Sequence, residues 1–209
     1  WTKTLNGVGS EFVEKMRIRS DMLYLVGTFS SNIDLDPGDG SVLASSSGEE
    51  GEGGGYVVKL DSNGVFQWAK SWSGTSTAKF DELQFGSDGT LHISGDFYGT
   101  LDFDPGAGTA HVTSQGQNDA FLLKLNANGE FVWVYTAGGS GGDCGHQVAV
   151  DGANNVYLGG EFSNTVQFGL SGSSVGQLTA LDTQDAFVVK LTANKTFVWA
   201  AHFGSKSTQ

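Results

Sequence analysis

An internal repeat with a period of about 65 residues constrains the fold of this chain more than any other feature. The sequence Phe-x-Trp occurs three times, at residues 66–68, 131–133 and 197–199, with intervals of 65 and 66. An apolar run that ends in Lys-Leu precedes each copy, at residues 56–60, 120–125 and 186–191. The sequence Gly-x-Phe recurs in the same way, at residues 27–29, 95–97 and 160–162. Three markers with one period predict three copies of a single structural unit.

Within each unit, apolar and polar residues alternate along short segments, a pattern typical of β-strands rather than helices. Turn sequences such as residues 61–64 and 126–129 separate these segments and contain the Asn-Gly pairs that favour hairpins. In the second unit we expect strands over residues 79–85, 90–97, 119–125 and 130–136. The segment 98–118 between the second and third of these strands is expected to form an additional hairpin or an extended loop.

Four antiparallel strands that repeat at a fixed period predict an all-β fold built from β-propeller blades, because one such unit cannot bury both of its faces alone. The three units extend approximately over residues 1–73, 74–138 and 139–209 of one repeat region. Residues 1–3 resemble residues 68–70, so the chain contains three units and a leftover strand. Closed propellers have about four to eight blades. We therefore expect this chain to belong to a larger propeller or array, or to close with another chain.

The composition excludes several other classes of protein. The 209 residues include 32 glycines but two prolines, and 38% are hydrophobic, which excludes collagen and a disordered segment. The single cysteine excludes both an intramolecular disulfide framework and a cysteine-based zinc site. The formal charge of −12 repels nucleic acid and anionic membranes, so neither is expected as a partner. No apolar stretch approaches the length of a membrane span.

Three segments between residues 119 and 157 also resemble a known family. They are residues 119–129, the Gly-rich segment 138–143 and residues 148–157. In these segments the chain resembles the bacterial β-propeller repeats abbreviated SBBP, and the resemblance covers nearly the whole chain in three copies. The acidic Pro-Gly insert at residues 102–106 resembles the variant found in exported proteins of Bacteroidetes-like bacteria. The third unit departs from this variant at residues 166–170.

The resemblance implies a non-catalytic module that is secreted or displayed at the cell surface, often through type IX secretion. It implies no defined set of functional residues. An export signal would lie outside this chain, which opens with Trp-Thr-Lys and has no charged and apolar leader. The expected location is therefore extracellular or at the cell surface.

The acidic Pro-Gly turns are the strongest candidates for a metal site. Asp34, Asp36 and Asp39 place three carboxylates within six residues, and Asp102 with Asp104 repeats the arrangement in the second unit. Carboxylate oxygens of this kind are ligands for Ca²⁺. The favoured alternative is that these aspartates only initiate a turn, because the spacing differs from that of a calcium loop and the third unit lacks them.

Several other groups carry weaker signals. The four histidines include no pair at metal-ligand spacing, and His92 aligns with Tyr24 and Tyr157, which favours a packing role. Cys144 and His146 resemble a nucleophile pair, but no orienting partner is evident and Cys144 aligns with Lys79. The acidic glycine-rich tract 48–55 is interpreted as a flexible loop.

Aromatic and acidic side chains offer two further interpretations. Carboxylates for glycoside hydrolysis are available at Asp81, Glu82, Asp96 and Glu161. Two of them, Asp96 and Glu161, occupy equivalent positions of successive units, which favours a repeated structural role. Trp68, Trp133 and Trp199 are expected to pack between adjacent blades, and Trp72 is the better candidate for an exposed aromatic side chain.

These observations favour a non-enzymatic propeller that serves as a scaffold or adhesion module and binds a protein or glycan at one face. An alternative is a structural or assembly component whose open blades pair with another chain of an outer-membrane or secretion complex. A propeller glycosidase or lyase is the least favoured interpretation, because no carboxylate cluster specific to one unit is evident. No cofactor is expected other than the calcium ion considered above.

Overall fold

The computed structural model describes residues 1–47, 53–73, 76–169 and 176–205. These residues form antiparallel β-strands and contain no helix, which confirms the prediction of an all-β fold. No helix within the described ranges could therefore cross a lipid bilayer.

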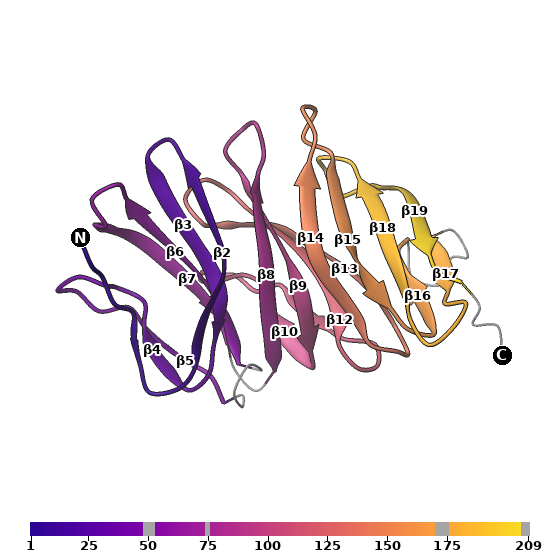
Figure 1. The fold of residues 1–209 in the computed structure, drawn as a ribbon, viewed down its shortest axis with the longest axis horizontal. Coiled ribbons are helices and arrows are strands. Elements are labelled where there is room, and N and C mark those ends of the chain that lie inside the picture. Colours follow the sequence, from indigo (N-terminus) through magenta and orange to yellow (C-terminus); the bar gives the residue numbers. More distant parts are fainter. Residues whose placement is uncertain (48–52, 74–75, 170–175, 206–209) are drawn as a thin grey trace.

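Three four-stranded antiparallel units follow one another across the molecule in chain order (Figure 1). The first contains β2 (Glu11–Arg19), β3 (Met22–Phe29), β6 (Gly54–Asp61) and β7 (Phe66–Trp72). The second contains β8 (Thr77–Phe85), β9 (Leu91–Tyr98), β12 (Asp119–Leu125) and β13 (Phe131–Gly139). The third contains β14 (Asp143–Val150), β15 (Val156–Phe162), β18 (Asp185–Leu191) and β19 (Phe197–Phe203). The strands expected in the second unit are confirmed, with bounds that differ by three residues at most.

A short hairpin interrupts each unit between its second and third strands. These hairpins are β4 (Asn32–Asp34) with β5 (Leu43–Ser45), β10 (Thr100–Asp102) with β11 (His111–Thr113), and β16 (Thr165–Gln167) with β17 (Gln177–Thr179). The hairpin interpretation of residues 98–118 is thus confirmed. The third hairpin pairs through β16 with the end of β13, and β4 pairs likewise with β1 (Asn6–Gly7). The first and third hairpins therefore extend the strand that precedes their own unit, whereas β10 and β11 form a separate two-stranded sheet.

A β-bulge at one equivalent position explains the Gly-x-Phe marker. The register shifts between Val13 and Lys15 in β2, between Phe80 and Glu82 in β8, and between Gly145 and Gln147 in β14. Glu14, Asp81 and His146 are therefore the bulged residues. A Cβ atom added to Gly27, Gly95 or Gly160 would lie 1.9 Å from a backbone oxygen of the strand opposite. Glycine is required there because the bulge brings the two backbones too close for any side chain.

Aromatic side chains fill the space between successive units. Trp72 packs on Phe80 with ring centroids 4.9 Å apart, and Phe80 packs on Phe121 at 5.0 Å. In β6, glycine at position 55 leaves room for the Phe80 ring, because an added Cβ would lie 2.0 Å from it. Residues 53–55 thus belong to the packed core, against the interpretation of tract 48–55 as a loop, and residues 48–52 lie outside the described part. Burial of these rings holds the units together.

The structure corrects the expectation that Trp72 is exposed. Its side chain is 2% exposed, and its Nε1 donates a hydrogen bond to the backbone oxygen of Phe103, 3.0 Å away. Trp72 is the last residue of β7, and its hydrogen bond joins the first unit to the hairpin region of the second. Each repeated tryptophan contacts a ring of its own unit: Trp68 lies on Tyr24, Trp133 on His92 and Trp199 on Tyr157. Trp68 and Trp133 also pack against the apolar clusters shared with the next unit, as expected, whereas Trp199 is 42% exposed. The packing role of His92, which is fully buried, is confirmed.

Candidate functional site

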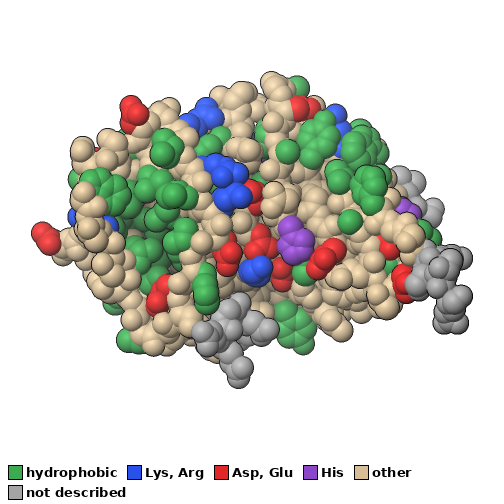
Figure 2. All heavy atoms as spheres, in the orientation of Figure 1, with side chains coloured by type: hydrophobic (Ala, Val, Ile, Leu, Met, Phe, Trp, Pro, Cys, Tyr) green, Lys and Arg blue, Asp and Glu red, His purple; other side chains and the backbone are tan. Residues whose placement is uncertain are grey.

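Charged side chains of both signs gather with a histidine near the middle of one face, over β8 and β14 (Figure 2). They come from the first strands of the three units and from residues packed beside them. We call this group the polar strip; its members are Lys15, Arg17, Lys79, Asp81, Glu82, Asp96, Asn118, Cys144, His146 and Glu161. The strip exists because β8 lies next to both β2 and β14.

Glu82 anchors the part of the strip that joins the first and second units. Its carboxylate is buried and accepts from Lys15 Nζ at 2.6 Å and from Arg17 Nη2 at 2.8 Å. Both cations are about one-third exposed, at 30% and 34%. Two cations for one buried carboxylate compensate the cost of removing that charge from water. Glu82 is therefore engaged in a structural ion pair.

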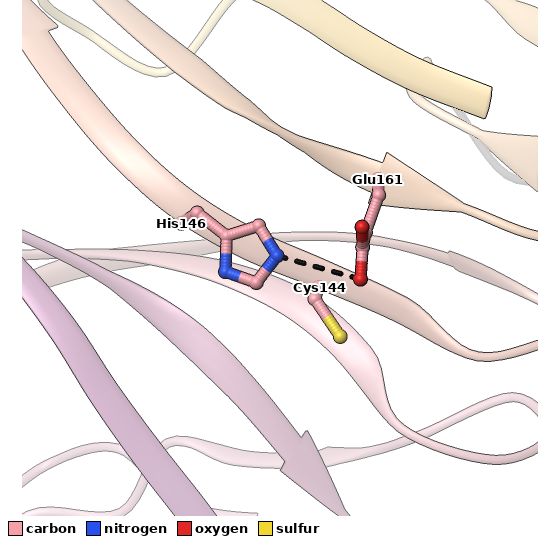
Figure 3. A group of neighbouring side chains, drawn as sticks. All are labelled: Cys144, His146 and Glu161. Atoms are coloured by element: carbon pink, nitrogen blue, oxygen red, sulfur yellow. Dashed lines mark ion pairs between the residues drawn. The ribbon is translucent and has the colours of Figure 1, made fainter. Parts of the chain in front are cut away.

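Cys144, His146 and Glu161 form the centre of the strip (Figure 3). Cys144 on β14 lies directly opposite Glu161 on β15, so both side chains project from the same face of the sheet. His146, two residues after Cys144, lies beside them, and its Nε2 is 3.5 Å from Glu161 Oε1. One possible ligand atom from each of the three residues lies within 4.8 Å of the others. Among the described residues this is the one group of three or more His, Cys, Asp or Glu side chains with that geometry.

The second unit supplies the neighbours that orient this centre. Asp81 Oδ2 lies 3.4 Å from His146 Nδ1, and Asp81 Oδ1 pairs with Lys79 Nζ at 2.8 Å. Asn118 Nδ2 donates to Cys144 Sγ at 3.0 Å and to Asp96 Oδ2 at 3.1 Å. The centre therefore lies at the contact between two units, with its three side chains on one unit and their partners on the other.

Electrostatics at this centre disfavour a nucleophilic cysteine. Burial, followed by the nearby charge of Asp96, raises the pKa of the Cys144 thiol to about 12. A thiol with this pKa stays protonated near neutral pH, and the thiolate is the nucleophilic form. Burial also raises the pKa of Asp96 to about 6, although the Asn118 amide opposes the shift. The arrangement does not activate the sulfur by itself.

The sequence alone does not bring these residues together. In the sequence, Cys144 with His146 is a weak nucleophile pair, and Asp81, Asp96 and Glu161 are dispersed carboxylates. The exclusion of a cysteine-based zinc site overlooks that a histidine and a carboxylate complete a three-ligand set around the one cysteine. The available signal was the repeat: Cys144 aligns with Lys79, and Glu161 is the middle residue of a Gly-x-Phe marker.

The acidic Pro-Gly turns lie on the inserted hairpins, away from the bulged strands. Asp34 Oδ1 accepts from the backbone N–H groups of Asp36 and Val42, and Asp102 Oδ1 accepts in the same way from Asp104 and Ala110. These backbone hydrogen bonds, that of Val42 first, lower the pKa of Asp34.

The next aspartates in these turns close them in the same manner. Asp36 and Asp104 each accept from a glycine N–H two residues later, at 2.8 Å. Asp39 is exposed, and Asp102 Oδ2 also lies 3.6 Å from His111 Nε2. The hydrogen bonds agree with the turn interpretation, and calcium binding by Asp34, Asp36, Asp39, Asp102 and Asp104 stays a prediction.

Comparison with known proteins adds one weak match. No protein-family model matches the chain. The chain is 24% identical over 160 residues to a curated protein of Caulobacter vibrioides described as "Regulatory protein FlaEY". The match covers 77% of this chain but 16% of the relative, so the chain spans about one-sixth of that protein's length.

Proposed function

We propose that this chain is a non-catalytic β-propeller scaffold, exported to the cell surface or beyond it, that binds a protein or glycan. The proposal rests chiefly on the way the first strands of three equivalent units lie side by side, β2 next to β8 and β8 next to β14. In a propeller the first strands line the central channel, and the loops at one end form a binding face. Each unit has a bulge in its first strand and a glycine opposite that bulge, so the three units share one local geometry.

Two features of the polar strip support binding rather than catalysis. Glu82 is held by two cations, so it is not free to act as a general acid or base. The raised pKa of Cys144 opposes nucleophilic attack by the thiol.

A second role, as an assembly component, is favoured by apolar side chains at the two ends of the sheet series. Val13, Met16 and Ile18 on β2 are 55%, 57% and 75% exposed. Val198, Trp199 and Phe203 on β19 are 47%, 42% and 64% exposed. Exposed apolar residues concentrated on two strands are typical of surfaces that contact another sheet or another chain.

A substrate screen distinguishes the scaffold from a propeller glycosidase or lyase. The purified chain is incubated with a panel of chromogenic glycosides and with acidic polysaccharides, and release of chromophore or of unsaturated product is measured. We expect no turnover. Turnover that Glu161→Gln or Asp81→Asn abolishes without lowering the melting temperature would contradict the proposal. Binding of the wild-type chain to a glycan microarray then tests recognition directly.

A further inference from the structure

We infer that Cys144, His146 and Glu161 bind one divalent transition-metal ion, and that Zn²⁺ is the ion they suit best. Cysteine sulfur, imidazole nitrogen and carboxylate oxygen together are the ligand types of zinc sites. Calcium and magnesium prefer oxygen ligands, so a sulfur and a nitrogen at the same centre select against them. This inference is independent of the scaffold function and of the calcium hypothesis for the acidic turns.

The spacing of the ligand atoms fits tetrahedral coordination. With Zn–N and Zn–O bonds of about 2.0–2.2 Å, two ligand atoms of a tetrahedron lie about 3.4 Å apart. His146 Nε2 and Glu161 Oε1 are 3.5 Å apart. The Cys144 sulfur completes a triangle whose sides are all 4.8 Å or less, which small side-chain rotations reduce to bonding geometry. His146 is two residues from Cys144 on β14, so strand alternation places it on the face that Cys144 and Glu161 share, and the three ligand atoms lie together despite the register shift at this point.

The surroundings resemble those of a metal ligand set in two respects. A histidine that binds metal through one ring nitrogen usually donates its other N–H to a carboxylate. Asp81 Oδ2 lies 3.4 Å from His146 Nδ1, in position to accept that hydrogen bond and leave Nε2 for the ion. Asn118 donates an N–H to Cys144 Sγ at 3.0 Å, an interaction that stabilises a metal-bound thiolate. Both neighbours come from the second unit.

The ligand set is specific to the third unit. Residues opposite each other at the equivalent place are Phe12 and Thr28 in the first unit and Lys79 and Asp96 in the second. The bulged residues are Glu14 and Asp81 instead of histidine. In the second unit Lys79 supplies positive charge beside Asp81 and Asp96. In the third unit Cys144 replaces that lysine, and a metal ion would supply the positive charge beside Glu161.

The site is accessible from solvent. The His146 and Glu161 side chains are 41% and 42% exposed. Three protein ligands leave a fourth position of a tetrahedral ion for water. Because Asp81 and Asn118 belong to the second unit and the ligands to the third, metal binding also stabilises the contact between these units.

Metal titration of the chain without a polyhistidine tag tests the inference. The protein is treated with EDTA, exchanged into chelator-free buffer and titrated with Zn²⁺ by calorimetry. In a parallel titration with Co²⁺, the visible spectrum and the thiolate-to-cobalt absorption report tetrahedral coordination by sulfur. We expect one ion per chain, a sulfur-to-cobalt band and a melting temperature that rises with zinc concentration.

Matched variants separate this site from nonspecific binding. Cys144→Ser, His146→Gln and Glu161→Gln are each expected to weaken zinc binding by about tenfold or more, and Asp81→Asn by about tenfold. His202→Gln serves as the control, because His202 also faces an aspartate, Asp185 at 3.2 Å, outside the cluster. The zinc affinity of the His202→Gln variant should equal that of the wild-type protein. Circular dichroism of each metal-free variant checks that it is folded. A wild-type protein that binds no more zinc than the His146→Gln variant, or binds cobalt without a sulfur band, overturns the inference.

Discussion

Replacement of Gly95 by alanine tests whether the repeated glycine is a steric requirement of the bulge. A Cβ atom at position 95 would lie 1.9 Å from the backbone oxygen of Lys79 and 2.8 Å from the Phe121 ring. Contacts of Cβ atoms below 3.0 Å are essentially never seen, so β8 and β9 would have to separate by about 1.1 Å, the difference between 3.0 and 1.9 Å. Neither neighbour can yield easily, because one is backbone and the other belongs to the packed core.

Such a displacement breaks hydrogen bonds beside the bulge and opens the core next to Phe121. Overpacking of this kind costs about 1–3 kcal/mol, and the backbone contact places Gly95→Ala at the upper end, about 3 kcal/mol. Gly152→Ala is the matched control, because an added Cβ at that turn meets nothing within 4 Å. There the loss of backbone freedom in the unfolded chain is expected to stabilise the protein by about 0.5 kcal/mol.

Equilibrium urea denaturation, followed by tryptophan fluorescence and by circular dichroism, measures both variants against wild type. Coincident transitions from the two probes are needed before a single free energy of unfolding is assigned. The two substitutions should shift stability in opposite directions. A Gly95→Ala variant within 0.5 kcal/mol of wild type, about the size of an ordinary surface substitution, would refute the steric explanation of the Gly-x-Phe marker.

Three further outcomes are expected from the same structure. Glu82→Gln should lower the free energy of unfolding by about 2 kcal/mol, because it removes the charge that Lys15 and Arg17 share; urea titration of the variant checks this. Burial raises the pKa of Asp119 from 3.8 to about 6, so the folded chain holds this proton more tightly than the unfolded chain. The corresponding stability is present below pH 4 and is lost as the pH rises toward 7, by about 3 kcal/mol. Urea titrations from pH 4 to 8 with EDTA present should show a smaller loss in Asp119→Asn than in wild type, and equal slopes would contradict the assignment. If the acidic turns bind calcium, EGTA lowers the melting temperature, and Asp34→Asn together with Asp102→Asn removes that effect; a melting temperature unchanged by EGTA excludes the hypothesis.

The strands were predictable because they carry their information locally. Alternating residues such as those of β9 and turns such as residues 126–129 encode hairpins without reference to the rest of the chain. The same pattern of strands and turns occurs in three repeats, which strengthens the prediction. Trp72 was misjudged because its burial depends on the hairpin of the next unit, where Phe103 accepts its hydrogen bond.

The candidate site was less predictable, since it depends on strand register and on contact between units. Alternation along β14 places Cys144 and His146 on one face, but it does not show that Glu161 of β15 lies directly opposite Cys144. Asn118 is 26 residues from Cys144 in the sequence, and Asp81 is 65 residues from His146. Such long-range contacts are known only once the packing of the sheets is known. The alignment of the repeats does show that Phe12, Lys79 and Cys144 occupy one position and differ in chemistry from unit to unit.

A cryo-electron microscopy or crystal structure of the full-length protein that contains this chain tests the central claim most directly. The propeller account expects further four-stranded sheets in a ring, with β2, β8 and β14 lining its inner surface and Trp199 of β19 covered by a neighbouring sheet, as Trp133 is packed against the third unit. Units arranged as an open stack, with Trp199 in solvent and the first strands facing no central channel, would contradict it.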